Sequence, residues 1–323
     1  MTQDGICRLC GKQAKLVKSH IIPECLGGKV KLLERVCKDC NDFLGRTIEA
    51  KMCKDFSFYR YLAKIRTKKG KDTTTPAELQ VMGKKVRVHI GEGGIPRFVP
   101  PIIETRYNKK RYFIVAESPE KLEKYAKRFK EMGIQFEFDS AHPLGVNLIF
   151  SAETRYLCSD DYLRVATKIA FEYLCFEYPP HAISSGYEKV KQFIKLGKCE
   201  GEKPAFLIYE KSLIEKMLYL PFPLHGILLF QYERIIGSIV SIFGLFYYFV
   251  LLKDDNRILQ NWVKFVYFNP ATGELRTPLI NKGYSLERLL RIITMARRDP
   301  DLEIKAREYS RDKINKFLGI INS

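Results

Sequence analysis

Two pairs of cysteines, each with two residues between its members, constrain the fold of this chain more than any other sequence feature. Cys7 and Cys10 form the first pair, and Cys37 and Cys40 form the second after 26 intervening residues. Four thiolates at this spacing are the ligand set of a closed, tetrahedral, structural zinc site. Because so short a segment cannot bury enough apolar surface to hold its own fold, a metal ion would supply the missing stability. The sequence therefore predicts a zinc-bound module near the N-terminus.

The other cysteines are scattered along the chain. They are Cys25, Cys53, Cys158, Cys175 and Cys199. The N-terminal residues contain no apolar stretch of the kind that forms a signal peptide. This predicts a cytoplasmic, reducing location, in which paired cysteines bind a metal rather than form disulfides.

The chain is strongly basic. Lys and Arg total 55 against 37 acidic residues, which gives a formal net charge of +18. A polyanion is the expected partner, because neutralising phosphates releases counterions. Two alternatives stay open on composition alone: a basic protein without a polyanionic partner, and a protein that binds an anionic membrane surface. The apolar fraction of 46% is enough for a sizeable core.

One uncharged segment, Ile235–Leu252, is just long enough to span a bilayer. It is rich in β-branched and aromatic residues and contains Gly237 and Gly244. Three consecutive buried strands with tight turns produce the same pattern, with the first strand in the apolar flank before Glu233. We expect strands, and no membrane anchor.

The remaining sequence predicts a mixed α+β fold. We expect a small N-terminal zinc-bound module at 1–56, a basic linker or helix at 57–75, and a larger α+β domain at 76–323. Expected helices begin at Ser118, Ser159 and Ser285, and a shorter one covers Tyr187–Leu196. Expected strands are Lys85–Ile90, Arg97–Ile103, Arg111–Ala116 and Gln135–Phe138, and most of 205–268.

A histidine motif lies between the two cysteine pairs. Ser19-His20-Ile21-Ile22-Pro23 is followed by Gly27-Gly28, and Asn41 comes directly after the last cysteine. Over about residues 7–55, this combination resembles the HNH endonucleases, the zinc-stapled branch of the ββα-metal nucleases. The resemblance implies a compact nuclease module in which Cys7, Cys10, Cys37 and Cys40 hold zinc and take no part in the chemistry.

The resemblance also implies the catalytic roles. His20 would be the general base that takes a proton from the attacking water. Asn41 would help to hold one divalent cation, Mg²⁺ or Mn²⁺, that stabilises charge on the phosphate. The implied activity is metal-dependent hydrolysis of phosphodiester bonds in DNA, in a bacterial defence setting.

Two positions depart from the family pattern. Ser19 stands where the family has Asp or Glu, an acid that is a metal ligand. Leu32 or Leu33 stands near the position of the family's middle Asn. Acids that could compensate are Glu24, Asp42 and Glu49, although residues of this type are more often solvated surface charges than metal ligands. Two hypotheses follow: an active variant of the nuclease, and a zinc-dependent nucleic-acid-binding protein whose catalysis is weakened or lost.

Basic residues surround the motif, and four of them are predicted to contact DNA phosphates. These are Lys18, Lys29, Lys38 and Arg46. The alternative is an ordinary solvated face. The sequence after the module has no P-loop, G-x-G-x-x-G or G-x-S-x-G motif. Its Tyr162–Gly197 segment is similar to a region that follows the module in some longer bacterial HNH proteins. We expect this part to select DNA, sense a signal, bind a protein partner or form a homo-oligomer.

Overall fold

The structure is a computed structural model. It describes residues 4–67, 69–71, 73–81, 84–91, 96–98, 102–106, 109–113, 119–131, 147–149, 157–178, 186–208, 220–254 and 261–277, with positions 287, 291, 301, 304, 305 and 308. The chain divides into two compact units, Met1–Tyr59 with Glu153–Ser323, and Arg60–Ala152. Both contain helices and strands, which confirms the predicted α+β fold class.

The first unit begins with a three-stranded antiparallel sheet followed by a helix. Its elements are β1 (Asp4–Ile6), β2 (Gln13–His20), η1 (Glu24–Leu26), β3 (Lys31–Cys37), α1 (Lys38–Leu44), η2 (Gly45–Glu49), α2 (Ala50–Asp55) and α3 (Ser57–Leu62). The strands β2 and β3 pair with an irregularity between Val17 and Ser19, and β2 ends at His20. The segment η2 is a π-helical stretch between α1 and α2, a conformation that is often found near functional sites. The hairpin and helix together give the predicted ββα arrangement.

A six-stranded antiparallel sheet forms the larger part of the same unit. In spatial order its strands are β10 (Ala205–Leu207), β13 (Phe246–Asp254), β12 (Ile235–Ile242), β11 (His225–Tyr232), β14 (Trp262–Phe268) and β15 (Leu275–Arg276). The uncharged segment Ile235–Leu252 is thus β12 and most of β13, and both strands are almost entirely buried. This confirms the prediction of consecutive strands. Within the described residues, no helix has the length and apolar character that crossing a membrane requires.

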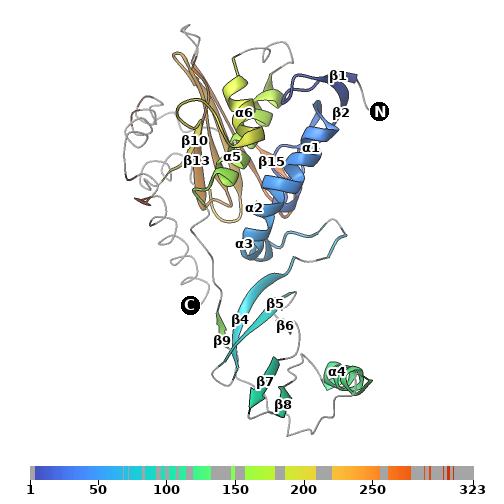
Figure 1. The fold of residues 1–323 in the computed structure, drawn as a ribbon. Coiled ribbons are helices and arrows are strands. Elements are labelled where there is room, and N and C mark those ends of the chain that lie inside the picture. Colours follow the sequence, from blue (N-terminus) through green and yellow to red (C-terminus); the bar gives the residue numbers. More distant parts are fainter. Residues whose placement is uncertain are drawn as a thin grey trace. The chain divides into compact units, whose positions relative to one another are not determined.

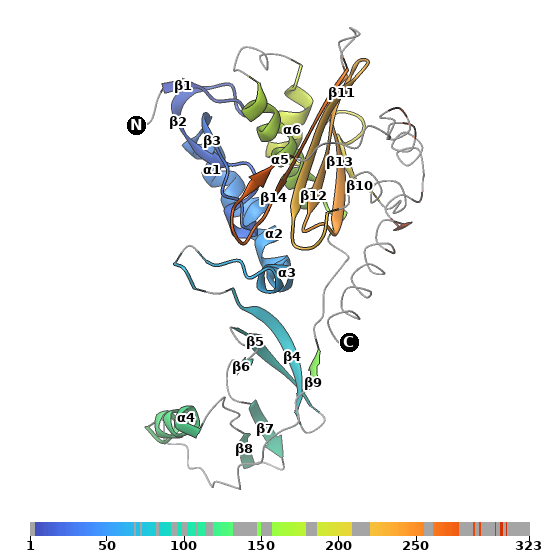
Figure 2. The same cartoon turned by 180° about the vertical axis from the view of Figure 1, so that it is seen from behind.

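Helix α5 (Asp160–Glu177) is the central element of the first unit. It packs against α6 (Glu188–Leu196), against β10 to β13 of the large sheet, and against β3 and η2 of the N-terminal segment. Figures 1 and 2 show α5 between the sheet and the N-terminal elements. Ser159 is the N-cap, as predicted, although its side chain makes no capping hydrogen bond. Gly197 ends α6 in the left-handed conformation, as the sequence predicts.

Aromatic side chains join the N-terminal segment to the large sheet. Phe56, which follows α2, has ring contacts with Tyr162 of α5 and with Phe243 and Phe246 of the sheet region, at centroid distances of 5.4 to 5.9 Å. Tyr59 contacts the same two phenylalanines. Residues up to Tyr59 therefore share one core with the sheet. The domain boundaries predicted at 56 and 76 differ from the boundaries of the compact units, which lie after Tyr59 and after Ala152. The predicted boundaries stay a prediction about functional modules.

The described residues between Lys71 and Ala152 of the second unit form two small antiparallel sheets and one helix. Its elements are β4 (Thr75–Val81), β5 (Lys84–Ile90), β6 (Pro96–Phe98), β7 (Ile102–Arg106), β8 (Lys109–Phe113), α4 (Pro119–Glu131) and β9 (Asn147–Ile149). The strands predicted at 85–90 and 111–116 and the helix after Ser118 correspond to β5, β8 and α4. The single strand expected at Arg97–Ile103 was wrong, because β6 and β7 belong to different sheets. Two prolines, Pro100 and Pro101, lie between them and cannot donate ladder hydrogen bonds.

Two predicted elements lie outside the described residues. They are the strand at Gln135–Phe138 and nearly all of the helix that was expected to begin at Ser285.

Candidate metal centre and active site

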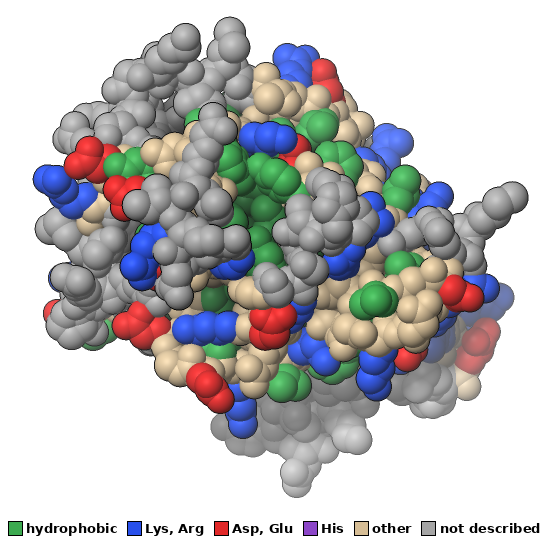
Figure 3. Space-filling model, turned by 90° about the horizontal axis from the view of Figure 1, so that it is seen from above, with side chains coloured by type: hydrophobic (Ala, Val, Ile, Leu, Met, Phe, Trp, Pro, Cys, Tyr) green, Lys and Arg blue, Asp and Glu red, His purple; other side chains and the backbone are tan. Residues whose placement is uncertain are grey.

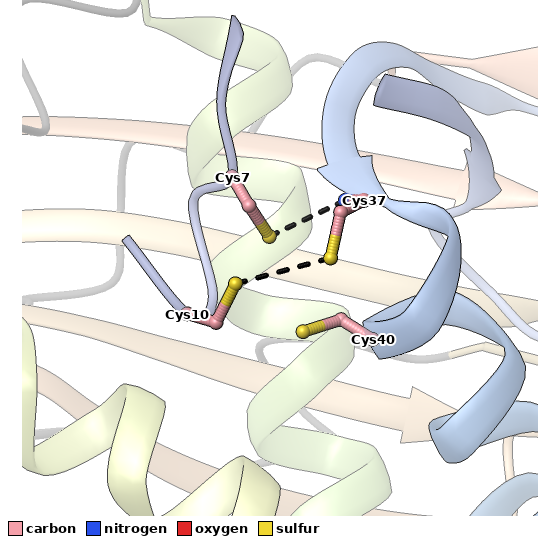
Figure 4. A group of neighbouring side chains, drawn as sticks. All are labelled: Cys7, Cys10, Cys37 and Cys40. Carbon is pink, nitrogen blue, oxygen red and sulfur yellow. Dashed lines mark hydrogen bonds between the residues drawn. The ribbon is translucent and has the colours of Figure 1, made fainter. Parts of the chain in front are cut away.

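The four paired cysteines meet in one cluster. Cys7 and Cys10 come from the turn between β1 and β2, Cys37 ends β3 at the N-cap of α1, and Cys40 lies in the first turn of that helix. Their sulfur atoms lie within 4.8 Å of one another. Figure 4 shows the four side chains pointing toward a common centre. The structure thus brings together the ligand set that the spacing predicts.

The size of the cluster fits a tetrahedral metal ion. Metal–sulfur bonds of about 2.3 Å in a tetrahedral site place the sulfurs about 3.8 Å apart. The Sγ atoms of Cys10 and Cys37 are 3.8 Å apart. The backbone N–H of Cys37 donates to Cys7 Sγ at 3.3 Å. Burial disfavours the Cys7 thiolate, but such backbone donors outweigh it and lower the pKa of Cys7. The chemistry and dimensions of the donors therefore suit a soft or borderline dication such as Zn²⁺.

Burial raises the pKa of the Cys40 thiol above its usual value, and the negative charge at Cys7 adds to the effect. Several thiolates this close repel one another in the absence of a cation. A bound dication would remove that penalty, so metal binding and the local fold are coupled.

His20 lies at the end of β2, and its side chain is 23% exposed. Its Nδ1 atom is 4.0 Å from a carboxylate oxygen of Glu24, which follows in η1. Burial is the largest influence on the imidazole and lowers its pKa, against the opposite effect of Glu24. A neutral, partly exposed imidazole is able to accept a proton near neutral pH, which is the property that a general base needs.

Ser19 faces the protein interior. It is 2% exposed, and its hydroxyl donates to Glu172 Oε1 of α5 at 2.8 Å. Successive residues of a strand point to opposite faces, so Ser19 faces α5 while the side chain of His20 lies on the other face. The serine hydroxyl is therefore engaged by a buried carboxylate at the position where the family carries its metal-binding acid.

Sequence reasoning missed Glu172. It lies in α5 among buried apolar residues, and Lys168 stands four positions before it. The available signal was a Lys and a Glu four positions apart within the mainly apolar stretch 165–176, because charged side chains are rarely buried without a partner. Nothing in the local sequence identified Ser19 as that partner.

The three acids named as compensating candidates have different surroundings. Asp42 forms ion pairs with Lys38 and Arg46 on the surface of α1 and η2. Glu49 is paired with Lys168 at 3.1 Å. Glu24 is the acid that pairs with the His20 ring, with a carboxylate oxygen 4.0 Å from Nδ1, while the charge of Glu49 also raises the pKa of that ring.

Asn41 follows Cys40 in α1 and is half-buried. Within the described part of the chain, the paired cysteines are the only group in which three or more His, Cys, Asp or Glu side chains come close enough to share a metal ion. A catalytic cation at Asn41 would thus take further ligands from water or from the phosphate itself. The role of Asn41 stays a prediction.

The Ile-Ile-Pro and Gly-Gly parts of the motif have structural explanations. Ile21 and Ile22 are fully buried. Gly27 has φ of +88°, and a Cβ atom there would come within 2.5 Å of Pro270. A Cβ atom on Gly28 would come within 1.9 Å of the Ile22 carbonyl oxygen. Both glycines therefore let the chain turn tightly behind His20.

His225 of β11 holds this turn from the large sheet. Its Nε2 atom lies 2.9 Å from the Leu26 carbonyl oxygen, and its Nδ1 accepts the Phe243 N–H at 3.1 Å. These partners require a neutral ring that donates from Nε2. Complete burial lowers the pKa of His225 to about 4, which agrees with that assignment. These contacts give His225 a structural role in holding the turn behind His20.

Cys25 and Cys53 are joined by a disulfide, with their Cα atoms 5.9 Å apart. The bond links η1 to α2 behind the His20 motif. Both residues are among the five scattered cysteines, and a disulfide between them does not fit the predicted reducing location. Their separation of 28 positions gave no local signal for pairing.

The four basic residues predicted to contact phosphate are all exposed. Two of them, Lys38 and Arg46, share Asp42 as an ion-pair partner, whereas Lys18 and Lys29 lie on the β2–β3 side. On the face shown in Figure 3, Lys and Arg side chains are spread over the surface with acidic side chains between them. The positions are compatible with phosphate contact, which stays a prediction.

Comparison with known proteins identifies the N-terminal segment. Residues 7–57 match the family model of the HNH endonucleases, which confirms the resemblance drawn from the motif. Neither a curated protein nor a solved structure shows significant similarity to the chain. The chain thus carries an HNH endonuclease segment whose first and second cysteine pairs, His20 and Asn41 all lie within the matched residues.

Proposed function

We propose that this protein is a metal-dependent endonuclease that hydrolyses phosphodiester bonds in DNA. The observation that carries the proposal is the HNH match at 7–57 with His20 placed, partly exposed and beside Glu24, at the end of β2. The formal charge of +18 supports a nucleic-acid substrate.

In the proposed reaction, the neutral imidazole of His20 takes a proton from the water that attacks the phosphorus atom. The Glu24 carboxylate, 4.0 Å from Nδ1, would stabilise the imidazolium that forms. A divalent cation, Mg²⁺ or Mn²⁺, held in part by Asn41, would supply charge stabilisation at the phosphate when bound. The cysteine cluster, with zinc as the proposed ion, fixes β1, β3 and α1 and leaves the chemistry to His20.

The second candidate is a nucleic-acid-binding protein without cleavage activity. It is favoured by one observation: the residue before His20 is a serine that bonds to Glu172 instead of a carboxylate that is available to a cation. A role in bacterial defence is proposed on the family resemblance alone. A cytoplasmic location is proposed on the paired cysteines, which are typical of metal binding in a reducing compartment, and the Cys25–Cys53 disulfide counts against it. A protein partner or homo-oligomer is proposed only as a role for the part of the chain beyond the HNH segment.

A plasmid-nicking assay with added Mg²⁺ or Mn²⁺ separates the two candidates. We expect the wild type to cut, and His20→Ala to lose on the order of 10²–10⁴-fold in rate, the usual contribution of a positioned general base. Zinc content and DNA affinity should not change, because His20 is in neither the cysteine cluster nor the predicted phosphate contacts. Asn41→Ala should lose activity that partly returns at higher cation concentration.

Equal cleavage by the wild type and His20→Ala, in preparations free of contaminating nuclease, would show that His20 is not the base. Salt-sensitive DNA binding without cleavage by either protein would favour the second candidate.

A further inference from the structure

A buried lysine lies directly behind His20. Lys168 of α5 is 2% exposed, and its ammonium contacts four oxygen atoms. Two are carboxylate oxygens, Glu49 Oε1 at 3.1 Å and Glu172 Oε2 at 2.9 Å. The other two are the backbone carbonyl oxygens of His20, which accepts a hydrogen bond from the ammonium, and of Ile21, at 3.4 Å. The buried Lys168 ammonium is thus surrounded by four oxygen atoms, one of which is the backbone carbonyl oxygen of the candidate base, His20.

The three charged residues of this cluster, Glu49, Lys168 and Glu172, come from two separate parts of the chain. Glu49 ends η2 of the HNH segment, and Lys168 and Glu172 lie one turn apart on α5. Glu172 uses its other oxygen to accept the Ser19 hydroxyl. The cluster therefore holds residues 19 to 21 through one side chain and two carbonyls, while the imidazole of His20 stays partly exposed on the opposite face.

Stability alone explains such a cluster poorly. Removing charges from water costs several kcal/mol per ion, and replacing a buried ion pair by neutral groups of similar shape is often neutral or stabilising. A buried ionic cluster that touches the backbone at a candidate base is better explained by the geometry that it imposes. A displacement of about 1 Å at a reacting group is enough to lower a rate on the order of 10²-fold.

Resting on the proposed nuclease function, we propose that Lys168, clamped by Glu49 and Glu172, is a positioning residue that fixes the backbone at His20 and so aims its imidazole at the attacking water. Helix α5, which lies outside the matched HNH residues, is then part of the working site. The HNH segment would need this helix for full activity.

The test removes the charges while keeping the shapes, with the triple variant Glu49→Gln, Lys168→Met, Glu172→Gln. We expect kcat for nicking to fall by on the order of 10–10²-fold. KM, zinc content and melting temperature should stay close to wild type. Asp161→Asn is the matched control, because it breaks an ion pair between α5 and Lys51 of α2 without touching residues 19 to 21. It should leave kcat unchanged.

A second measurement does not need activity. Imidazole ¹H–¹⁵N spectra should show the His20 signals displaced or doubled in the triple variant, and the His225 signals unchanged as an internal reference. If the wild type does not cut DNA, the proposed function fails while these spectra still decide the positioning role. If the triple variant does not fold, Glu49→Gln alone removes the most exposed of the three charges. It should lower kcat by on the order of 3–10-fold or displace the His20 signals. A folded variant with wild-type kcat and unmoved His20 signals would overturn the proposal.

Discussion

The HNH segment has two spatial regions, the cysteine cluster and the residues around His20, and they are held in place by different means. They are called the cysteine end and the His20 end. At one end, four cysteines from two short turns converge on a single point, and every ligand lies within residues 7–40. At the other end, groups from distant parts of the chain hold the residues around His20. Lys168 of α5 donates to the His20 carbonyl, Glu172 of α5 accepts the Ser19 hydroxyl, and His225 of the large sheet bonds to the Leu26 carbonyl.

The cysteine end is held by residues close in sequence, and the His20 end is held by residues far away in sequence. The cysteine cluster is a self-contained device whose geometry follows from ligand spacing. The His20 end has no comparable cluster of local ligands. It depends on side chains about 150 to 200 positions away, so the HNH segment is folded into the first compact unit instead of standing as an independent module. Each prediction below asks whether the two ends are as separable as their contacts indicate.

The largest effect is expected from loss of the metal. Chelation, or Cys37→Ser, should remove a metal whose binding is coupled to folding of the local turns, with binding free energies of about 10–16 kcal/mol in isolated zinc modules. Hydrogen exchange should accelerate most around residues 7–12 and 37–41. The amides around residues 20–28 should be affected less, because α5 and the large sheet also hold them.

Elemental analysis should find one zinc per chain in protein purified without chelator. Cys199→Ser, which alters a thiol outside the cluster, is the control and should keep the metal. A metal-free but fully protected wild type would show that the cysteine end needs no ion.

A smaller effect is expected from Ser19→Asp. This change restores the acid that the family carries, but it places a second carboxylate against Glu172, whose side chain is only 1% exposed. We expect a loss of about 3–5 kcal/mol in unfolding free energy, as for an uncompensated buried charge. Ser19→Ala, which removes only one hydrogen bond, should cost about 1–3 kcal/mol. Thermal or urea unfolding measures both.

The rate of DNA cleavage by Ser19→Asp tests the same substitution independently of its stability. If Ser19→Asp were stable and cut DNA faster than the wild type, the Ser19–Glu172 bond could not be a fixed feature of the His20 end.

The smallest effect concerns pH. Burial lowers the pKa of His225 to about 4, so the folded protein keeps this ring neutral where the unfolded chain, with a pKa of 6.5, takes up a proton. Its contribution is therefore complete above about pH 6.5 and is lost as the pH falls toward 4, by at most about 3 kcal/mol. His225→Gln should flatten this part of the stability profile. A slope in His225→Gln identical to that of the wild type would contradict the assignment of a neutral His225.

Local patterns were sufficient for much of the fold. The apolar runs separated by tight turns gave the strands β11 to β13, and Ser159 and Gly197 marked helix boundaries that the structure confirms. These features depend on residues within one or two turns of each other. The single strand predicted across Pro100 and Pro101 was wrong because its two halves pair in different sheets, and the two prolines between them cannot donate ladder hydrogen bonds.

The sequence by itself determined the cysteine ligand set and the HNH motif, because metal–ligand chemistry fixes both residue type and spacing. Only the tertiary structure decided that Ser19 faces Glu172, that Lys168 grips the backbone of His20, and that Cys25 meets Cys53. Ser19 and Glu172 are 153 positions apart, and a hydrogen bond over this separation produces no recognisable pattern in the sequence around either residue. Which distant charges meet in a core is set by how the helices and sheets pack, and that packing is a property of the whole unit.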